Sequence, residues 1–263
     1  MRMTRQAARK AVLASAFLFF PIYMNLFSPY VIIDGAFQGI VSGSFAVFMG
    51  LFVLSLFAGR GFCGWGCPMG GYQELLAKAN GKAPKGGRWN LAKYAIWVPW
   101  FGIVLTGGIM AGGFRRLDLF HLMDGGISVS RPEAWVIYFM VVGVITAVPL
   151  LAGRRAFCRY VCWIGVFQIL GSKIRSRFRW PSLHLEADKT KCGRCGSCDR
   201  KCPMGLGVSA MVQAGSMAND ECVLCGSCVD ACPRKAIRFA GTWAPGASIA
   251  ASPACSGAPC GRQ

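Results

Sequence analysis

Four long stretches without a charged residue stand out in the first 153 residues of the chain. Their lengths are 23, 19, 20 and 19 residues. As helices that rise about 1.5 Å per residue, all four come close to crossing a hydrocarbon core of roughly 30 Å. Buried helices of water-soluble proteins rarely stay uncharged for so long, so the pattern predicts four transmembrane helices. The stretches are Ala11–Ile33, Val41–Gly59, Tyr94–Gly113 and Ala134–Ala152.

The first stretch has a second interpretation, because the basic segment Met1–Lys10 precedes it as it would in a signal peptide. Its apolar run is longer than the core of a typical signal peptide. We therefore interpret it as a membrane helix, and we expect a bend at Pro21.

The basic residues fix an expected orientation. The chain has 29 Lys and Arg against 11 Asp and Glu, a net charge of +18. Of the 29, 26 lie before the first stretch, in the connection Arg60–Lys93, or after Gly153. Lys and Arg accumulate on the cytoplasmic side of membrane proteins, so these three segments are predicted to be cytoplasmic, at a bacterial inner membrane. The positive charge therefore needs no nucleic-acid partner, and it suits anionic membrane lipid.

Eight of the 14 cysteines form two identical runs with the spacing C-x2-C-x2-C-x3-C, each followed by proline. The runs are offset by 30 residues, and this spacing is that of bacterial ferredoxins with two 4Fe–4S clusters. Three thiolates of a run bind one cluster and the fourth binds the other. The predicted ligand sets are Cys192, Cys195, Cys198 and Cys232 for one cluster, and Cys222, Cys225, Cys228 and Cys202 for the other. Zinc sites use pairs of cysteines rather than such runs, and cytoplasmic disulfides are rare.

These patterns predict the fold class and the domains. We expect a membrane α-helical domain over residues 1–180 and an α+β dicluster ferredoxin domain over residues 181–239. Residues 240–263 are rich in Gly, Ala, Pro and Ser and are predicted to be disordered. They contain Cys255 and Cys260, which fit neither run and receive no role.

An internal repeat places two further cysteine pairs after the second and fourth stretches. At an offset of 95 residues, Phe62, Gly70, Gln73 and Leu75 match Phe157, Gly165, Gln168 and Leu170, as do the cysteine pairs themselves. In a helix, the spacing C-x3-C puts both thiols on one face. If the repeated units pack side by side, the pairs converge at the inner membrane surface, where a third metal centre, a redox dithiol or a docking surface would each fit. The alternative is buried structural cysteine. The pairs are Cys63 with Cys67, and Cys158 with Cys162.

With these motifs, the chain resembles the NapH/NosR-type membrane ferredoxins, which include the MauN-like proteins, over about Val12–Phe239. The family combines membrane helices, C-x3-C-P elements and a dicluster ferredoxin. The chain departs from this pattern at Trp163, where the family usually has proline. The resemblance implies transfer of electrons from membrane quinol toward a periplasmic reductase system.

Three polar residues of the connection between the third and fourth stretches are weaker candidates for a quinol site. Quinol oxidation needs a base that accepts a proton, and histidine or a carboxylate would serve. Polar residues in such loops more often cap helix ends, and the same applies to Asp34 on the other outer connection. The three candidates are Asp118, His121 and Asp124.

Two functions follow from these predictions. The chain is either an electron carrier or quinol dehydrogenase-type subunit that exchanges electrons between the quinone pool and a redox partner protein, or an accessory protein that supplies electrons for maturation, or senses redox state, for another metalloenzyme. A transporter is disfavoured, because the predicted membrane segments carry no charged residue that could mark an ion path. Neither reading makes the chain a stand-alone enzyme.

Overall fold

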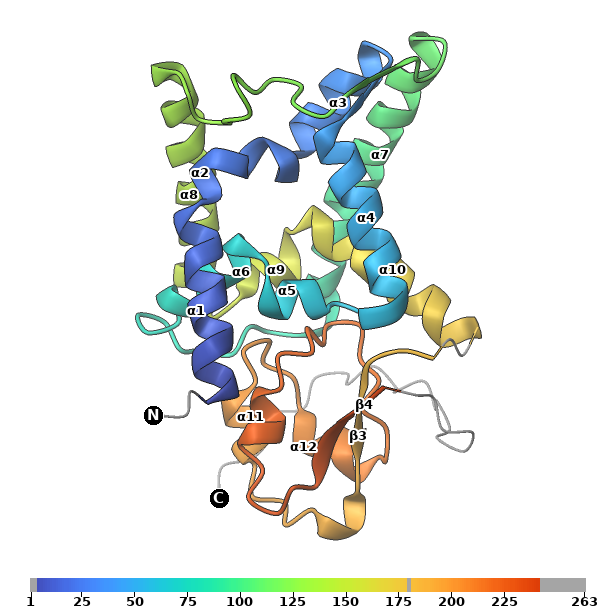
Figure 1. Cartoon of the computed structure of the whole chain (residues 1–263). Coiled ribbons are helices and arrows are strands. Elements are labelled where there is room, and N and C mark those ends of the chain that lie inside the picture. Colours follow the sequence, from blue (N-terminus) through green and yellow to red (C-terminus); the bar gives the residue numbers. More distant parts are fainter. Residues whose placement is uncertain (1–3, 179–180, 242–263) are drawn as a thin grey trace.

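The computed structural model describes residues 4–178 and 181–241, which form a helical half (residues 4–178) above a cysteine-rich module (residues 181–241) (Figure 1). Most of the predicted disordered segment 240–263, with Cys255 and Cys260, lies outside the described residues. The first repeated unit of the helical half contains α1 (Arg5–Leu18), α2 (Phe20–Tyr23), η1 (Met24–Phe27), α3 (Pro29–Phe37), β1 (Ile40–Ser42), α4 (Gly43–Ala58), α5 (Gly61–Trp65) and α6 (Pro68–Leu76). The second contains η2 (Gly87–Leu91), α7 (Ala92–Met110), β2 (Arg116–Asp118), α8 (Pro132–Ala152), α9 (Ala156–Tyr160) and α10 (Trp163–Phe178).

Two of the four predicted stretches are helices long and apolar enough to cross a membrane. They are Gly87–Met110, which joins η2 to α7, and Pro132–Ala152, which is α8. Many of their large apolar side chains are exposed, among them Val98, Ile109 and Phe139. Exposed apolar area on this scale marks a surface that contacts lipid or protein.

The other two stretches differ from straight 20-residue helices. In the first, the chain bends by 58° between α1 and the pair α2–η1. Pro21 lies in the first turn of α2 and has no N–H to continue the hydrogen bonding of α1, so the bend falls where it was expected. In the second, α4 has 16 residues, which span about 24 Å at 1.5 Å per residue. Its limits are the Ser42 side chain, which accepts a hydrogen bond from the N–H of Phe45, and Gly59, whose φ is 54°.

In each repeated unit, the last helix packs both on its own unit and on the other unit. Helix α6 packs against α1 of its own unit and α8 of the other, and its equivalent α10 packs against α7 of its own unit and α4 of the other. An apolar core fills the space between them, with Phe20, Phe48, Phe157 and Phe167 among its members. This arrangement is that of two similar units related by a pseudo-two-fold axis.

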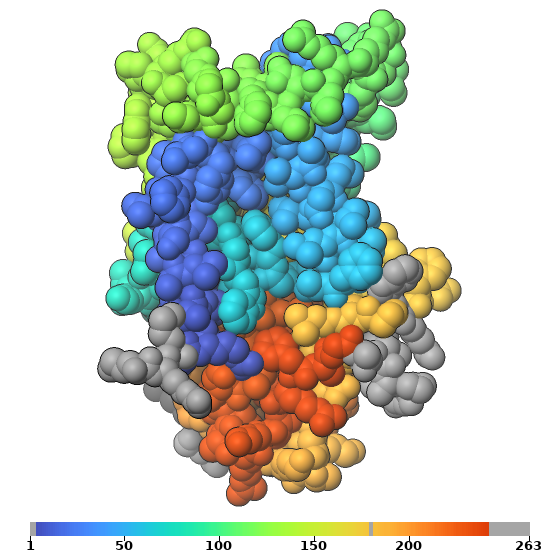
Figure 2. Space-filling model, in the orientation of Figure 1, coloured from blue at the N-terminus to red at the C-terminus, as the bar shows by residue number. Residues whose placement is uncertain are grey.

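At the far end of the helical half, opposite the module, the connection between α7 and α8 crosses over the helix ends (Figures 1 and 2). Its strand β2 pairs in parallel with β1, with Val41 opposite Leu117. The backbone N–H groups of Ser128 and Val129 bond to carbonyls of Ile22 and Pro21. The far end is therefore closed by backbone pairing between connections of the two units.

The cysteine-rich module has an antiparallel strand pair and short helices, the α+β pattern expected of a small ferredoxin. Strand β3 pairs with β4, with Leu185 opposite Phe239. Apolar side chains such as Met204, Val212 and Ile237 fill a second core. The elements are β3 (His184–Ala187), η3 (Lys189–Lys191), α11 (Ser197–Lys201), α12 (Val208–Gln213), α13 (Ser227–Asp230) and β4 (Ile237–Ala240).

Candidate functional site

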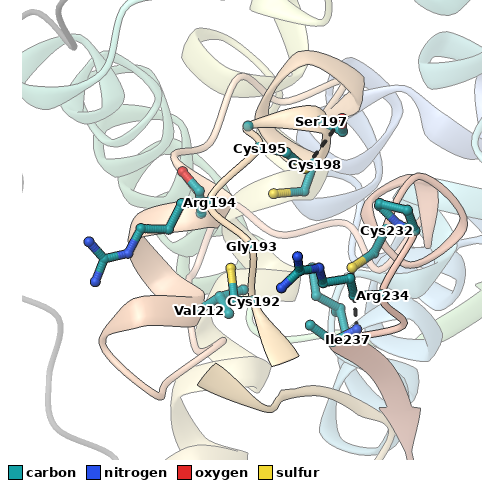
Figure 3. A pocket seen from close by; sticks show the side chains of 14 residues that line it. Cys192, Gly193, Arg194, Cys195, Ser197, Cys198, Val212, Cys232, Arg234 and Ile237 are labelled. Carbon is teal, nitrogen blue, oxygen red and sulfur yellow. Dashed lines mark hydrogen bonds between the residues drawn. The ribbon is translucent and has the colours of Figure 1, made fainter. Parts of the chain in front are cut away.

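Two cavities in the cysteine-rich module each combine three cysteines of one run with the fourth cysteine of the other. The first has a volume of about 130 Å³ and the second about 20 Å³. The cysteines of the first cavity are Cys192, Cys195, Cys198 and Cys232 (Figure 3). Those of the second cavity are Cys202, Cys222, Cys225 and Cys228. Four thiols around one cavity are the donor set that a 4Fe–4S cluster requires.

The backbone of the two runs turns in the same way around the cavities. Arg194 and Leu224 occupy equivalent positions and have φ values of 52° and 49°. Gly196 and Gly226 follow two residues later with φ values of 66° and 74°, and each begins a short helix, α11 or α13. These left-handed turns curl each loop around its own cavity.

The cavities differ in exposure and in charge. Cys195 in the first cavity is exposed, whereas Cys225 and Cys228 in the second are buried. Arg194 and Arg234 line the first cavity, but no charged residue lines the second. The first cavity therefore opens to solvent, and the second lies within the apolar core.

The C-x3-C elements are broken helices. Cys63 lies in α5, but Cys67 is extended, with φ −75° and ψ 120°, and precedes α6. The two cysteines of this pair therefore do not share one helix, because Pro68 disfavours helical backbone at the residue before it. The second element breaks in the same way without that proline: both Cys67 and Cys162 donate a backbone hydrogen bond of 3.0 Å to the carbonyl five residues earlier. Trp163 therefore does not change the local fold.

Two buried glutamines link the elements across the pseudo-two-fold axis. The amide nitrogen of Gln73 donates to Sγ of Cys158 at 3.0 Å. In the other unit, Sγ of Cys63 lies 3.0 Å from Oε1 of Gln168. Both glutamines are fully buried. If the Gln168 amide were turned over, its nitrogen would donate to the sulfur as Gln73 does.

Two buried arginines make a second reciprocal link. Arg155 donates to the carbonyl of Cys63 at 2.9 Å, and its equivalent Arg60 donates to the carbonyl of Cys158 at 3.5 Å. A Cβ on Gly70 would lie 2.9 Å from the Cys63 carbonyl oxygen, and one on Gly165 would lie 3.0 Å from a nitrogen of Arg60. The glycines of the repeat therefore leave room for these contacts.

The four cysteines of the two elements lie close enough to affect one another's ionisation. Burial raises the pKa of Cys67 well above the usual thiol value, and charge on Cys63, Cys158 or Cys162 would raise it further. Burial, followed by charge on Cys158 and Cys63, raises the pKa of Cys162 to about 12. Cys67 and Cys162 are therefore neutral thiols when no metal is bound. A bound metal cation would instead favour the thiolate form.

Within the described residues, no set of three or more His, Cys, Asp or Glu is arranged to hold a single metal ion. This includes the eight cysteines around the two cavities. A single zinc ion needs sulfurs at about 2.3 Å from one point.

The cysteine-rich module packs directly on the C-x3-C elements. A Cβ on Gly64 would overlap the carbonyl oxygen of Val223, and the Trp65 side chain donates to the Leu224 carbonyl at 3.1 Å. From the second element, Arg159 donates to the Met204 carbonyl at 2.7 Å. Val223 and Met204 line the second cavity, so this cavity lies next to both elements.

Buried ion pairs hold both the elements and this interface. Glu221 binds Arg60 at 2.8 Å and also pairs with Lys93. Glu74 binds Arg155 at 2.7 Å and Arg9 at 2.8 Å. Burial alone would raise the pKa of Glu221, but Arg60 and Lys93 hold it below its usual range. Arg60 and Arg155 each pair with a carboxylate that also binds a second cation, so one net positive charge remains in each group.

The weaker candidates lie at the far end, away from the cysteines. His121 lies 2.6 Å from Asp34 and 3.8 Å from Asp118. Asp124 does not join them, because it pairs with Arg131 at 2.7 Å. The helix α8, whose 21 residues span about 32 Å at 1.5 Å per residue, runs between the connection that carries this cluster and the second cysteine element.

Several residues that surround the cysteines have no role that the sequence alone indicates. Gln73 and Gln168 were visible as matches in the repeat, but nothing in the repeat indicates that each reaches the other unit. Arg60 and Arg155 were also visible as basic residues before each element. Nothing in the sequence indicates a role for Glu221 and Lys93, because their contact joins segments that are more than 120 residues apart.

Comparisons with known proteins find two kinds of iron–sulfur domain along the chain. A family model described as a 4Fe-4S binding domain matches residues 41–86 and 133–181, which contain the two C-x3-C elements. A model described as a 4Fe-4S dicluster domain matches residues 184–236. No solved structure matches the chain. The fold and the cysteine sets therefore define an iron–sulfur electron-transfer protein.

Similar proteins of known name indicate which iron–sulfur proteins this chain is related to. The putative electron transport protein YccM of Escherichia coli is 25% identical over 80% of this chain and 58% of its own length. The regulatory protein NosR of Stutzerimonas stutzeri is 31% identical over 65% of this chain and 23% of NosR. Protein NirI of Paracoccus denitrificans is 31% identical over 70% of this chain and 26% of NirI. The chain belongs to the 4Fe–4S ferredoxin family of NosR, NirI and FixG.

The chain thus spans little more than half the length of YccM and about a quarter of NosR and NirI.

Proposed function

We propose that this protein carries electrons between the quinone pool of a bacterial inner membrane and a redox partner protein. Oxidation of a quinol to a quinone releases two electrons and two protons. In this proposal the electrons move one at a time toward the partner, which is the oxidant, and the protons pass to water. The same sites would serve the reverse direction.

One observation carries the proposal: the four C-x3-C cysteines connect the two apolar cores. Cys67 and Cys162 belong to the core of the helical half. Cys63 and Cys158 belong to the core of the cysteine-rich module, together with Cys225. A redox centre at this point would lie between the bilayer and the second cavity.

The two cavities of the module fit 4Fe–4S clusters, which would supply one-electron exchange when bound. The proposed ligands are the crossed sets that line the cavities. Around the first cavity, the backbone N–H of Ala236 donates to Sγ of Cys232 at 3.2 Å. Hydrogen bonds to sulfur stabilise negative charge on it and tune cluster potentials.

We further propose a third redox centre at Cys63, Cys67, Cys158 and Cys162, either an iron–sulfur cluster or a pair of redox-active dithiols. The two buried groups, Arg60 and Lys93 with Glu221 and Arg155 and Arg9 with Glu74, each keep one net positive charge, which would offset the negative charge of thiolates there. The amides of Gln73 and Gln168 would donate to two of the sulfurs. Since the His121 cluster lies at the far end of α8, we place quinone exchange near these cysteines.

Four membrane crossings with the module in the cytoplasm complete the proposal. The distribution of basic residues supports it, as do the apolar helices α7 and α8. In this topology the bent segment α1–η1, continued by α3, and the short helix α4 are the other two crossings.

Reporter fusions test this topology. Alkaline phosphatase fused after His121 should be active, because this position is placed in the periplasm, whereas fusions after Lys82 and Gly241 should be inactive. Fusions of green fluorescent protein at the three sites provide the matched control and should show the opposite pattern. Phosphatase activity at Lys82 or Gly241 with none at His121 would invert the proposed orientation.

Quinol-dependent reduction tests the role of the C-x3-C cysteines. In nanodiscs with added menaquinol, the wild type should show prompt bleaching of cluster absorbance. The double variant Cys67→Ser with Cys162→Ser should lose at least tenfold in rate while dithionite still reduces its ferredoxin clusters, because only the route from the bilayer is broken. The double variant Cys255→Ser with Cys260→Ser makes the same chemical change and should match the wild type. Full quinol-dependent bleaching in the Cys67/Cys162 variant would make these cysteines structural.

A second candidate is an accessory role in the maturation or regulation of another metalloenzyme. The relative NosR is described as a regulatory protein, and FixG as a nitrogen fixation protein. A deletion strain distinguishes the two functions. A partner enzyme that is present but lacks its metal cofactor would favour the accessory role, whereas a complete enzyme without electron supply would favour the carrier.

A further inference from the structure

We propose that the open side of the first cavity is the docking site for a small, acidic, soluble electron-carrier protein. The inference rests on the proposed function in one respect: electrons must enter or leave the cysteine-rich module by way of this cavity. It adds the location and the charge of the partner's surface.

The first observation is the exposure of the cavity. Cys195 is the one exposed cysteine among the eight that line the two cavities. The second cavity is covered by the helical half, which packs on Val223 and Met204. A protein partner can therefore approach a cysteine ligand closely at the first cavity and not at the second.

The second observation is a group of three arginines around this opening, here called the basic rim: Arg194, Arg200 and Arg234. Arg200 donates to the Cys195 carbonyl at 3.2 Å and to Ser197 at 3.0 Å. The Arg234 guanidinium lies against the other run, where a Cβ on Gly193 would be 3.1 Å from its carbon. No ion pair to a carboxylate is found for these three arginines within residues 4–178 and 181–241. The rim is thus uncompensated positive charge beside an exposed cysteine.

The basic rim is not needed to hold a cluster. The second cavity offers the same set of four thiols, and none of its lining residues is charged. The nearest acidic side chain in the first run, Asp199, is occupied by hydrogen bonds from the backbone and hydroxyl of Ser209. The arginines therefore accompany the opening to solvent rather than the cysteine set.

Membrane orientation does not explain the rim either. Basic residues direct topology when they lie within about 15–20 residues of a membrane segment. All three arginines follow the end of α8, the last proposed crossing, by more than 40 residues. Attraction to anionic lipid falls off within a Debye length of about 8 Å. Of the three arginines, Arg200 contacts the helical half, because its carbonyl accepts a hydrogen bond from Arg154 at 2.9 Å, so binding with neutral and with anionic lipid is needed to distinguish a carrier from a lipid surface.

Positive charge around a redox site favours a partner with a negative rim around its own redox site. Such complementary charges speed encounter and fix orientation, and the effect weakens as salt rises. The partner chemistry that fits is a compact acidic carrier, such as a flavodoxin or a plant-type ferredoxin.

Binding of an oxidised flavodoxin to the full-length protein in nanodiscs tests the proposal without any electron transfer. At low salt, the double variant Arg194→Glu with Arg234→Glu should bind at least tenfold more weakly than the wild type. The difference should vanish near 1 M salt, where the Debye length is about 3 Å. The control Lys78→Glu with Arg88→Glu reverses two exposed charges at the other side of the interface and should bind as the wild type does. Iron content should be unchanged in both.

If the double Glu variant loses iron, Arg194→Gln with Arg234→Gln replaces it and should weaken binding by a smaller factor. Equal binding of wild type and rim variants, a loss that persists at 1 M salt, or the same loss in the control would each overturn the proposal. A wild type that binds flavodoxin in neutral nanodiscs but not in anionic ones would also overturn it, because that result would mean that anionic headgroups cover the rim. Failure of the quinol assay with intact flavodoxin binding would instead count against the proposed function.

Discussion

The variant Glu221→Gln should loosen the cysteine-rich module from the helical half. Glu221 is the buried counter-ion of both Arg60 and Lys93, and the substitution leaves these two positive charges buried without compensation. Removal of one partner from a buried ion pair costs about 3–5 kcal/mol. The midpoint temperature of thermal unfolding in detergent should fall by roughly 10 °C, since each kcal/mol lowers it by about 2–4 °C in a chain of this size.

The control is the same substitution at Glu186, whose partner Arg238 is mostly exposed. An exposed pair contributes under about 1 kcal/mol, so Glu186→Gln should leave the midpoint almost unchanged. Limited proteolysis between the two halves should increase only in Glu221→Gln. Equal midpoints for the two variants would show that the buried charges gain other partners and that the pair does not hold the interface.

The variant Cys202→Ala should remove the second cluster and leave the first. Cys202 belongs to the first run by sequence, but it lines the second cavity with three cysteines of the other run. With two clusters in the ferredoxin runs and none elsewhere, iron should fall from about eight to about four per chain. Mass spectrometry after alkylation should find the thiols of Cys222, Cys225 and Cys228 newly reactive.

The equivalent change at Cys232 is the matched control. It should expose the thiols of Cys192, Cys195 and Cys198, since Cys232 lines the first cavity. Alkylation of the first run in Cys202→Ala would show that each run binds its own cluster and that the crossed assignment is wrong. More than eight iron atoms in the wild type would add support for a third centre at the C-x3-C elements.

The parts of this fold that could be predicted from sequence are those that depend on residues close together in the chain or on a repeated motif. Most of α7 and α8 is visible in the sequence as two uncharged stretches, and Pro21 marks the bend after α1. The paired runs place four cysteines around each cavity because their spacing is short and repeated. The offset of 95 residues reveals two similar units before any coordinates are known.

The rest depends on contacts that no local pattern contains. The backbone break between Cys63 and Cys67 has a local cause in Pro68, yet the same break occurs before Trp163, where packing rather than proline produces it. The pairing of His121 with Asp34 joins two connections that are 87 residues apart. The polar contacts of Gln73 and Gln168 cross between the units, and the repeat shows that they are equivalent without showing what they touch.

The two buried arginines of the repeat are neutralised from different places, and this has a consequence for biosynthesis. Arg155 pairs with Glu74, which the ribosome has already added when Arg155 is made. The partner of Arg60 is Glu221, which is translated 161 residues after it. Until then, Arg60 and Lys93 must stay hydrated, and the contact surface below α5 must stay open. The helical half is therefore completed last at its centre, when the cysteine-rich module arrives. The buried charges of Arg60 and Lys93 are therefore balanced only after the cysteine-rich module has been made, although the two halves are separate segments of the sequence.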